Sequence, residues 1–146
     1  MKGCVLLDTG PLVAAINRRD HFHTWVTAQW ANIEPPLLTC EAVISEACFI
    51  LRNVYGGQDA VISLVRNGVI KIPFNLDEEA TVIAELIKTY QSVPMSLADA
   101  CLVRMSEMYL NSSLLTFDRI SLCIDEIKIK LFQLLCHSRV LFLCHL

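Results

Sequence analysis

The stretch CVLLDTGP, residues 4–11, decides the fold class of this chain. Its first four residues form the short, continuous apolar run typical of a strand buried on both faces of a parallel sheet. Gly10 and Pro11 follow closely, and proline is common in the first turn of a helix, where a backbone N–H needs no intrahelical partner. The stretch therefore predicts a strand over 4–7 that passes directly into a helix carrying residues 12–16.

The same alternation of short apolar runs and helical patterns continues along the chain. Helices are predicted at 12–16, 21–33, 42–53, 58–66, 76–90 and, opened by Pro94 and Ser96, as far as Tyr109. Strands are predicted at 4–7, 37–38, 69–72 and 113–116, with a further strand or mixed segment at 127–135. Thr39 is the expected N-cap of the third helix. Such alternation implies right-handed crossovers and a parallel sheet between helical layers.

Length and composition are those of one apolar-rich domain. The chain has 146 residues, of which 54% are hydrophobic and 18% charged, against typical values of roughly 45–50% and about 25%. We therefore expect a single domain over 1–146, with an atypical C-terminal tail from about residue 120. The net charge of −3 excludes a generic basic coat for nucleic acid, which depends on a dense field of Lys and Arg.

Cysteine usage and hydropathy bear on where the protein resides. The seven cysteines are odd in number and show no C-x-x-C spacing, which favours a reducing, cytoplasmic environment. No segment has the roughly 18 uncharged apolar residues of a membrane helix, and the N-terminal apolar run is too short for a signal peptide. We expect a cytoplasmic protein with no membrane association.

Acidic residues fall where a parallel sheet places its ligands, beyond the carboxyl ends of its strands. Asp8 follows the first strand and Asp118 follows the strand near 113–116, so both are expected at the same edge. Glu46 and Asp99 lie in the early turns of two helices that would start from that edge. The sequence therefore predicts that four acids converge.

Glu46 is the strongest single signal among them. It lies in AVISEACFIL, residues 42–51, where apolar residues cover most of the helix circumference. A buried, isolated charge there would cost several kcal/mol unless a partner or a metal compensates it. The other acids have structural alternatives: Asp8 as an N-cap, Asp99 in a capping box with Ser96, and Asp118 as a turn residue.

Carboxylates that lie close together repel one another. Mg²⁺ or Mn²⁺ binds such oxygen ligands and would offset this repulsion. Two divalent ions about 3.5–4 Å apart can activate water and stabilise the leaving oxygen of a phosphodiester. Metal ions would also supply the positive field that a protein of net charge −3 lacks.

Four ordered segments, LLDTGPL (6–12), the helix with Glu46, SLADA (96–100) and LTFDR (115–119), resemble the acidic motifs of the PIN-domain nucleases. The resemblance extends to VapC-like members, toxins of type II toxin–antitoxin systems. It implies a PIN-like three-layer α/β/α sandwich with a central, mainly parallel sheet. It also implies an Mg²⁺- or Mn²⁺-dependent endoribonuclease that hydrolyses RNA, forms homodimers and is inhibited by a cognate antitoxin protein.

The resemblance also assigns roles to residues. Asp8, Glu46 and Asp99 would be the core metal ligands, and Asp118 the more variable fourth. Thr9 and Thr116 match hydroxyl positions that orient carboxylates or water.

Other interpretations carry less weight. Asp8-Thr9-Gly10 is also the triplet of aspartic proteases, which are nearly all β, and a phosphatase would need a second aspartate where Gly10 stands. The pairs at 136–137 and 144–145, each Cys-His, match no closed zinc site. Arg18 and Arg19 fit either a solvated loop or contacts to RNA phosphates near Asp8. The competing class of function is a non-catalytic PIN-like module that binds RNA or a partner.

Overall fold

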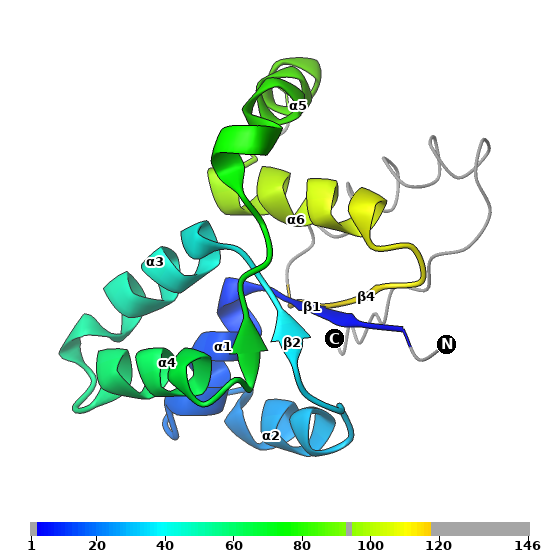
Figure 1. The fold of residues 1–146 in the computed structure, drawn as a ribbon. Coiled ribbons are helices and arrows are strands. Elements are labelled where there is room, and N and C mark those ends of the chain that lie inside the picture. The colour runs from blue at the N-terminus through cyan, green and yellow to red at the C-terminus, as the bar shows by residue number, and fades with distance from the viewer. Residues whose placement is uncertain (1–2, 93–94, 118–146) are drawn as a thin grey trace.

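A four-stranded parallel sheet forms the centre of the computed structural model, which describes residues 3–92 and 95–117 (Figure 1). The strands are β1 (Val5–Leu7), β2 (Leu37–Leu38), β3 (Ile70–Lys71) and β4 (Ser113–Leu115), arranged in the order β3-β2-β1-β4. All three pairings are parallel, and Leu6 lies opposite both Leu38 and Leu114. The strands are short and apolar because both faces of the sheet are covered.

Helices cover both faces of this sheet. They are α1 (Thr9–Ile16), α2 (His23–Ala31), α3 (Glu41–Ile50), α4 (Gly57–Arg66), α5 (Leu76–Thr89) and α6 (Leu97–Met108), with a short 3₁₀ helix, η1 (Leu51–Asn53), after α3. In Figure 1, α5 and α6 lie on one side of the sheet and α1 and α2 on the other. The predicted three-layer α/β/α fold is confirmed, and the direction of the chain explains the layers. From β1 to β2 to β3 the chain moves in one direction across the sheet, and from β3 to β4 it moves back in the other. Because such crossovers are right-handed, the helices between β1 and β3 lie on one face and those between β3 and β4 lie on the opposite face.

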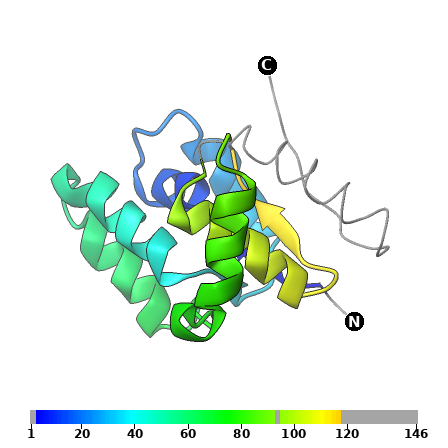
Figure 2. The same ribbon diagram turned by 90° about the horizontal axis from the view of Figure 1, so that it is seen from above.

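The buried core lies where the sheet meets these helices. Leu6, Leu37 and Ile70 are completely buried in the three neighbouring strands, as is Met105 on α6. Burying each such side chain stabilises the fold by about 1.5–3 kcal/mol. Helices α3 and α4 lie side by side at one edge in both views (Figures 1 and 2), and several of their apolar side chains stay in solvent.

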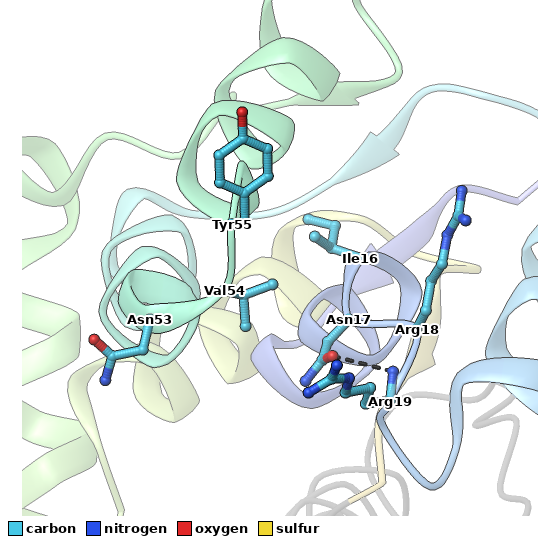
Figure 3. Close-up of a pocket in the computed structure, with 7 residues that line it drawn as sticks. All are labelled: Ile16, Asn17, Arg18, Arg19, Asn53, Val54 and Tyr55. Atoms are coloured by element: carbon cyan, nitrogen blue, oxygen red, sulfur yellow. Dashed lines mark hydrogen bonds between the residues drawn. The ribbon is translucent and has the colours of Figure 1, made fainter.

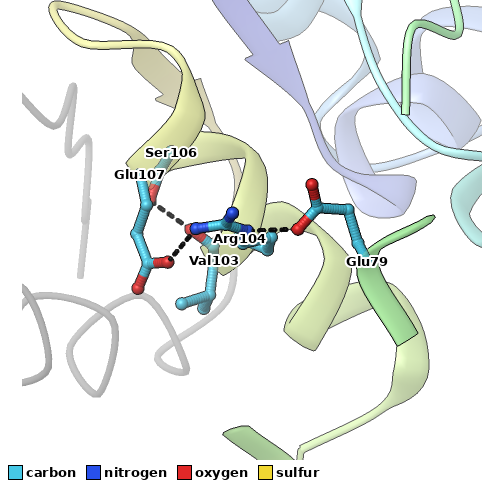
Figure 4. A network of polar contacts seen from close by, with 5 residues as sticks. All are labelled: Glu79, Val103, Arg104, Ser106 and Glu107. Atoms are coloured by element: carbon cyan, nitrogen blue, oxygen red, sulfur yellow. Dashed lines mark hydrogen bonds and ion pairs between the residues drawn. The ribbon is translucent and has the colours of Figure 1, made fainter. Parts of the chain in front are cut away.

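An ion-pair network fastens α5 to α6 (Figure 4). Arg104 on α6 donates to Glu79 on α5 and, at 3.2 Å, to Glu107 one turn further along its own helix. The hydrogen bond to Glu79 raises the pKa of the Arg104 guanidinium, which therefore stays charged. This network links the two helices and includes none of the acids predicted from the sequence as metal ligands.

The predicted elements agree with the described structure to within a few residues, with two differences. The end of the helix predicted over 42–53 is η1, a tighter 3₁₀ turn. Thr39 is not the N-cap of α3: Cys40 holds that place without a side-chain hydrogen bond, and the buried Thr39 hydroxyl donates to the Leu7 carbonyl at 2.7 Å. That prediction was wrong because β2 runs beside β1, which offers Thr39 a closer acceptor. The segment predicted at 127–135 lies outside the described residues.

None of the helices in residues 3–92 and 95–117 is long and apolar enough to cross a membrane.

Candidate functional site

Asp8 leaves the carboxyl end of β1 and begins α1. Its backbone is extended (φ −89°, ψ 166°) and its N–H donates to Leu115 at the end of β4. One carboxylate oxygen, Oδ1, accepts from the Thr9 N–H at 2.7 Å, and the other, Oδ2, accepts from the Thr116 hydroxyl at 2.7 Å. The carboxylate is therefore oriented by residues that follow two neighbouring strands, β1 and β4.

Thr9 links Asp8 to Glu46. The Thr9 side chain is only 6% exposed, and its hydroxyl donates to Glu46 Oε2 at 2.8 Å. One chain of hydrogen bonds thus runs from Thr116 through Asp8 and Thr9 to Glu46. It joins residues from the ends of β1 and β4 and from the middle of α3, which are far apart in sequence.

Glu46 is exposed, so the prediction of its burial was wrong. In α3 only Val43 and Ala47 are buried, while Phe49 and Ile50 are 64% and 52% exposed. The apolar residues that surround Glu46 in the sequence do not enclose it, because α3 lies at the edge of the molecule with one face in solvent. The cost of burial therefore does not explain this carboxylate, whereas its hydrogen bond to Thr9 places it beside Asp8.

Asp99 occupies the first turn of α6 and completes a capping box there. Its Oδ2 accepts from the Ser96 N–H at 2.9 Å, and its own N–H donates to the Ser96 hydroxyl at 3.1 Å. In residues 3–92 and 95–117, every hydrogen bond of the Asp99 side chain is with Ser96. The structure does not join Asp99 by a hydrogen bond to Asp8 or Glu46.

Helices α3 and α6 nevertheless begin side by side, because two buried cysteines, Cys40 just before α3 and Cys101 in the second turn of α6, line the same pocket. The hydrogen bond between Cys40 and Cys101 lowers the pKa of Cys40 and, together with burial, raises that of Cys101. Glu46 is close enough for its negative charge to raise the pKa of Cys40, which opposes the effect of Cys101. The helix turn that carries Asp99 and the helix that carries Glu46 are therefore neighbours.

Three candidate residues remain. Asp118 is outside the described residues. Arg18 and Arg19 are exposed just beyond the C-terminal end of α1. Because that eight-residue helix is about 12 Å long, both arginines lie at its opposite end from Asp8. The sequence left two alternatives open for them, a solvated loop and contacts to RNA phosphates near Asp8.

Phe117 is a positioning residue that the sequence analysis missed. Its ring packs over Gly10, where an added Cβ would lie 3.0 Å from the ring atom Cδ2. It also packs against Phe22 and Trp25, at centroid distances of 4.7 and 5.6 Å. These contacts hold the end of β4 against the start of α1. The sequence feature that could have identified it is an aromatic residue between Thr116 and Asp118, together with a glycine in the first turn of the helix that follows Asp8.

The donor set suits a hard divalent cation. Asp8 and Glu46 supply carboxylates and Thr9 and Thr116 supply hydroxyls, so every side-chain atom in this chain of hydrogen bonds is an oxygen. Mg²⁺ is commonly held by one or two carboxylates and several waters. No cluster of three or more His, Cys, Asp or Glu side chains is arranged for a metal within the part of the chain that the structure describes. Asp8 and Glu46 therefore form a partial ligand set that fits such an ion.

Comparisons with known proteins agree with this geometry. The family model described as PIN domain matches residues 5–127. Among solved structures, the chain is similar to a crystal structure of Mycobacterium tuberculosis VapC20, named as a Sarcin-Ricin loop cleaving toxin. The TM-score is 0.65 at 21% sequence identity, over 82% of this chain and 94% of that chain. No curated protein matches the sequence. The structural likeness shows the fold, and the family match covers most of the chain.

Proposed function

The chain belongs to the PIN domain family, and on that premise we propose that it is an endoribonuclease that hydrolyses RNA phosphodiester bonds with Mg²⁺ or Mn²⁺. The observation that carries the proposal is the hydrogen-bonded chain Thr116–Asp8–Thr9–Glu46 at the carboxyl end of β1. That is the edge where open α/β sheets bind their ligands. The similarity to a toxin named for cleaving the sarcin-ricin loop supports RNA as the substrate.

In this proposal Asp8 and Glu46 hold the ion, and Asp99 and Asp118 are further ligands. A bound Mg²⁺ or Mn²⁺ supplies a Lewis acid that lowers the pKa of water and stabilises charge on the leaving oxygen. Thr116 and Thr9 orient the two carboxylates before the ion arrives. Both hydroxyls donate hydrogen bonds, so they leave the remaining lone pairs of these oxygens available for coordination.

Asp99 can serve as both cap and ligand. Only its Oδ2 is used by Ser96, and Oδ1 makes no hydrogen bond in the described residues. One oxygen can therefore hold the start of α6 while the other faces a metal. This double use explains how a residue with a complete structural role remains a candidate ligand.

We also propose that the protein is a cytoplasmic toxin that forms a homodimer and is inhibited by a cognate antitoxin protein. The exposed apolar side chains of α3 and α4, Phe49, Ile50 and Ile62, support a surface that a partner covers. The cysteines of the described residues, Cys4, Cys40, Cys48 and Cys101, are free. Their free state is compatible with a reducing compartment.

The direct test is RNA cleavage with Mg²⁺, with Mn²⁺ and with EDTA. We expect the protein to cleave RNA and EDTA to abolish this cleavage. Asp8→Asn or Glu46→Gln should lower the cleavage rate by more than about 100-fold, because losses of about 10–100-fold are typical of residues that only orient metal ligands. Asp59→Asn and Glu85→Gln are matched controls, because both are exposed acids on other helices, α4 and α5. Binding of RNA without cleavage in any metal would instead support a non-catalytic PIN-like module.

A further inference from the structure

A pocket of about 560 Å³ lies at the opposite end of α1 from Asp8 (Figure 3). It is lined by two segments, residues 16–19 at the C-terminal end of α1 and residues 53–55 at the end of η1. In Figure 3, Arg18 and Tyr55 extend in the same direction from opposite sides, with Ile16 and Val54 between them. We call it the arginine–tyrosine pocket.

Tyr55 is fully exposed, with a relative accessibility of 105%. Its backbone is nevertheless held, because the Val54 N–H donates to Leu51 and the Gly57 N–H donates to Val54, both at 2.9 Å. Gly56 follows with φ of 69°, a conformation that glycine adopts at little cost. A large, fully exposed ring on a fixed turn is available to stack on a base.

The two arginines supply positive charge without partners of their own. Arg18 and Arg19 are exposed, and neither makes an ion pair within residues 3–92 and 95–117. The Arg19 N–H donates to Asn17 Oδ1 at 3.1 Å, which fixes the turn that carries both. In a chain with 15 acidic and 12 basic residues, these two arginines add positive charge beyond the end of α1. Their guanidinium groups extend in different directions in Figure 3, so each is suited to a separate phosphate.

The pocket lies within reach of the same RNA strand as the acids. The two lie at opposite ends of α1, which is about 12 Å long and corresponds to about three or four nucleotides at 3.4 Å per stacked nucleotide. Because no residue of α1 is exposed, an RNA strand that reaches both passes over the neighbouring helices and spans more than this number. Polar side chains dominate its lining, unlike the neighbouring hollow between α1, α2 and α4, which includes Trp30 and Leu64. An apolar protein segment would fit that neighbouring hollow better.

We propose that the arginine–tyrosine pocket is a substrate subsite that holds single-stranded RNA a few nucleotides from the scissile phosphate. A base stacks on Tyr55, and phosphates pair with Arg18 and Arg19. This inference rests on the proposed function, since it presumes an RNA substrate.

The test measures RNA binding apart from cleavage. All variants are made in the Asp8→Asn background, and binding of fluorescent single-stranded RNAs of 2–10 nucleotides is followed by anisotropy. Tyr55→Ala should weaken binding of the longer RNAs roughly 5- to 100-fold, as for loss of one stacked base, whereas Tyr55→Phe should stay within about twofold. The shortest RNAs, which cannot reach the pocket from Asp8, should not distinguish the variants.

Salt dependence tests the arginines. Replacing both by glutamine should reduce the slope of log K against log[salt] by about 1.4, at about 0.7 per phosphate of a single strand. Arg66→Gln, an exposed arginine on α4, is the matched control. Thermal unfolding should be unchanged, because these side chains are exposed and make no packing contacts that stabilise the fold.

The outcomes separate the two proposals. If the parent protein binds and cleaves RNA while the pocket variants bind it equally well, the subsite is wrong and the nuclease stands. If the pocket variants keep RNA affinity but lose binding of an antitoxin or of a second copy, the pocket is a protein contact and the subsite is overturned. If the parent neither binds nor cleaves RNA, the proposed function fails and the subsite fails with it.

Discussion

Thr9 lies between the two carboxylates of the candidate site and donates a hydrogen bond to each of them. Its N–H holds Asp8 and its hydroxyl holds Glu46, so one residue orients both. The side chain is nearly buried, which keeps water from competing for the hydroxyl. Removing this single donor would free Glu46, because no other described group donates a hydrogen bond to its carboxylate.

Thr9→Val keeps the shape of the side chain and deletes its donor. We expect RNA cleavage at limiting Mg²⁺ to fall about 10- to 100-fold, the range for groups that orient metal ligands, and to recover at high Mg²⁺. Thr9→Ser should retain activity, and Thr81→Val, at an exposed position on α5, is the control. Cleavage by Thr9→Val that equals the parent at every Mg²⁺ concentration would remove Thr9 from the site.

Helix α6 carries the candidate ligand Asp99 in its first turn. The capping box of Ser96 and Asp99 accounts for where α6 begins, and the contact between Cys40 and Cys101 accounts for its position beside α3. A capping role and a ligand role make different demands on Asp99. A cap needs an acceptor oxygen, whereas a metal ligand needs the negative charge.

Asp99→Asn separates these demands, because the amide keeps an acceptor oxygen and loses the charge. We expect it to change the free energy of unfolding by less than about 1 kcal/mol and to lower RNA cleavage by more than about 100-fold. Ser96→Ala should do the reverse, with a loss of about 1 kcal/mol of stability and cleavage retained well below the melting temperature. Urea unfolding and cleavage rates measure the two effects, and normal cleavage by Asp99→Asn would leave this residue a cap only.

At the scale of the whole molecule, the sheet brings together acids that lie far apart in the chain. The carboxyl ends of β1 and β4 are adjacent because these strands pair along their full length, from Val5 and Ser113 to Leu7 and Leu115. Packing of α1 against α3 then places Glu46 over the start of α1. A cation held by these separate segments would stabilise the folded chain, because the unfolded chain cannot gather its ligands.

Mg²⁺ is therefore expected to stabilise the fold through binding. At 100 times its dissociation constant the gain in the free energy of unfolding should be about 2.7 kcal/mol, measured by urea unfolding at constant ionic strength. Asp8→Asn and Glu46→Gln should lose most of this gain, while Asp59→Asn keeps it. An equal gain in all four proteins would show that Mg²⁺ acts elsewhere on the surface.

Local patterns in the sequence were enough to predict much of this protein. Apolar runs such as residues 4–7 and helical spacing such as residues 76–90 predicted the strands, the helices and the parallel sheet, because burial imposes those periods on any chain. The position of Asp8 after β1 and the capping box of Ser96 and Asp99 were predicted for the same reason. They depend on residues only a few places apart.

Contacts between distant segments were decided by the tertiary structure alone. The sequence did not reveal that Glu46 is exposed and bonded to Thr9, that Thr39 turns to Leu7, or that Tyr55 shares a pocket with Arg18. Each depends on how one helix or strand lies against another, and on which face of α3 is left in solvent. Periodicity along one segment specifies which residues share a face, but only packing between segments determines what that face meets.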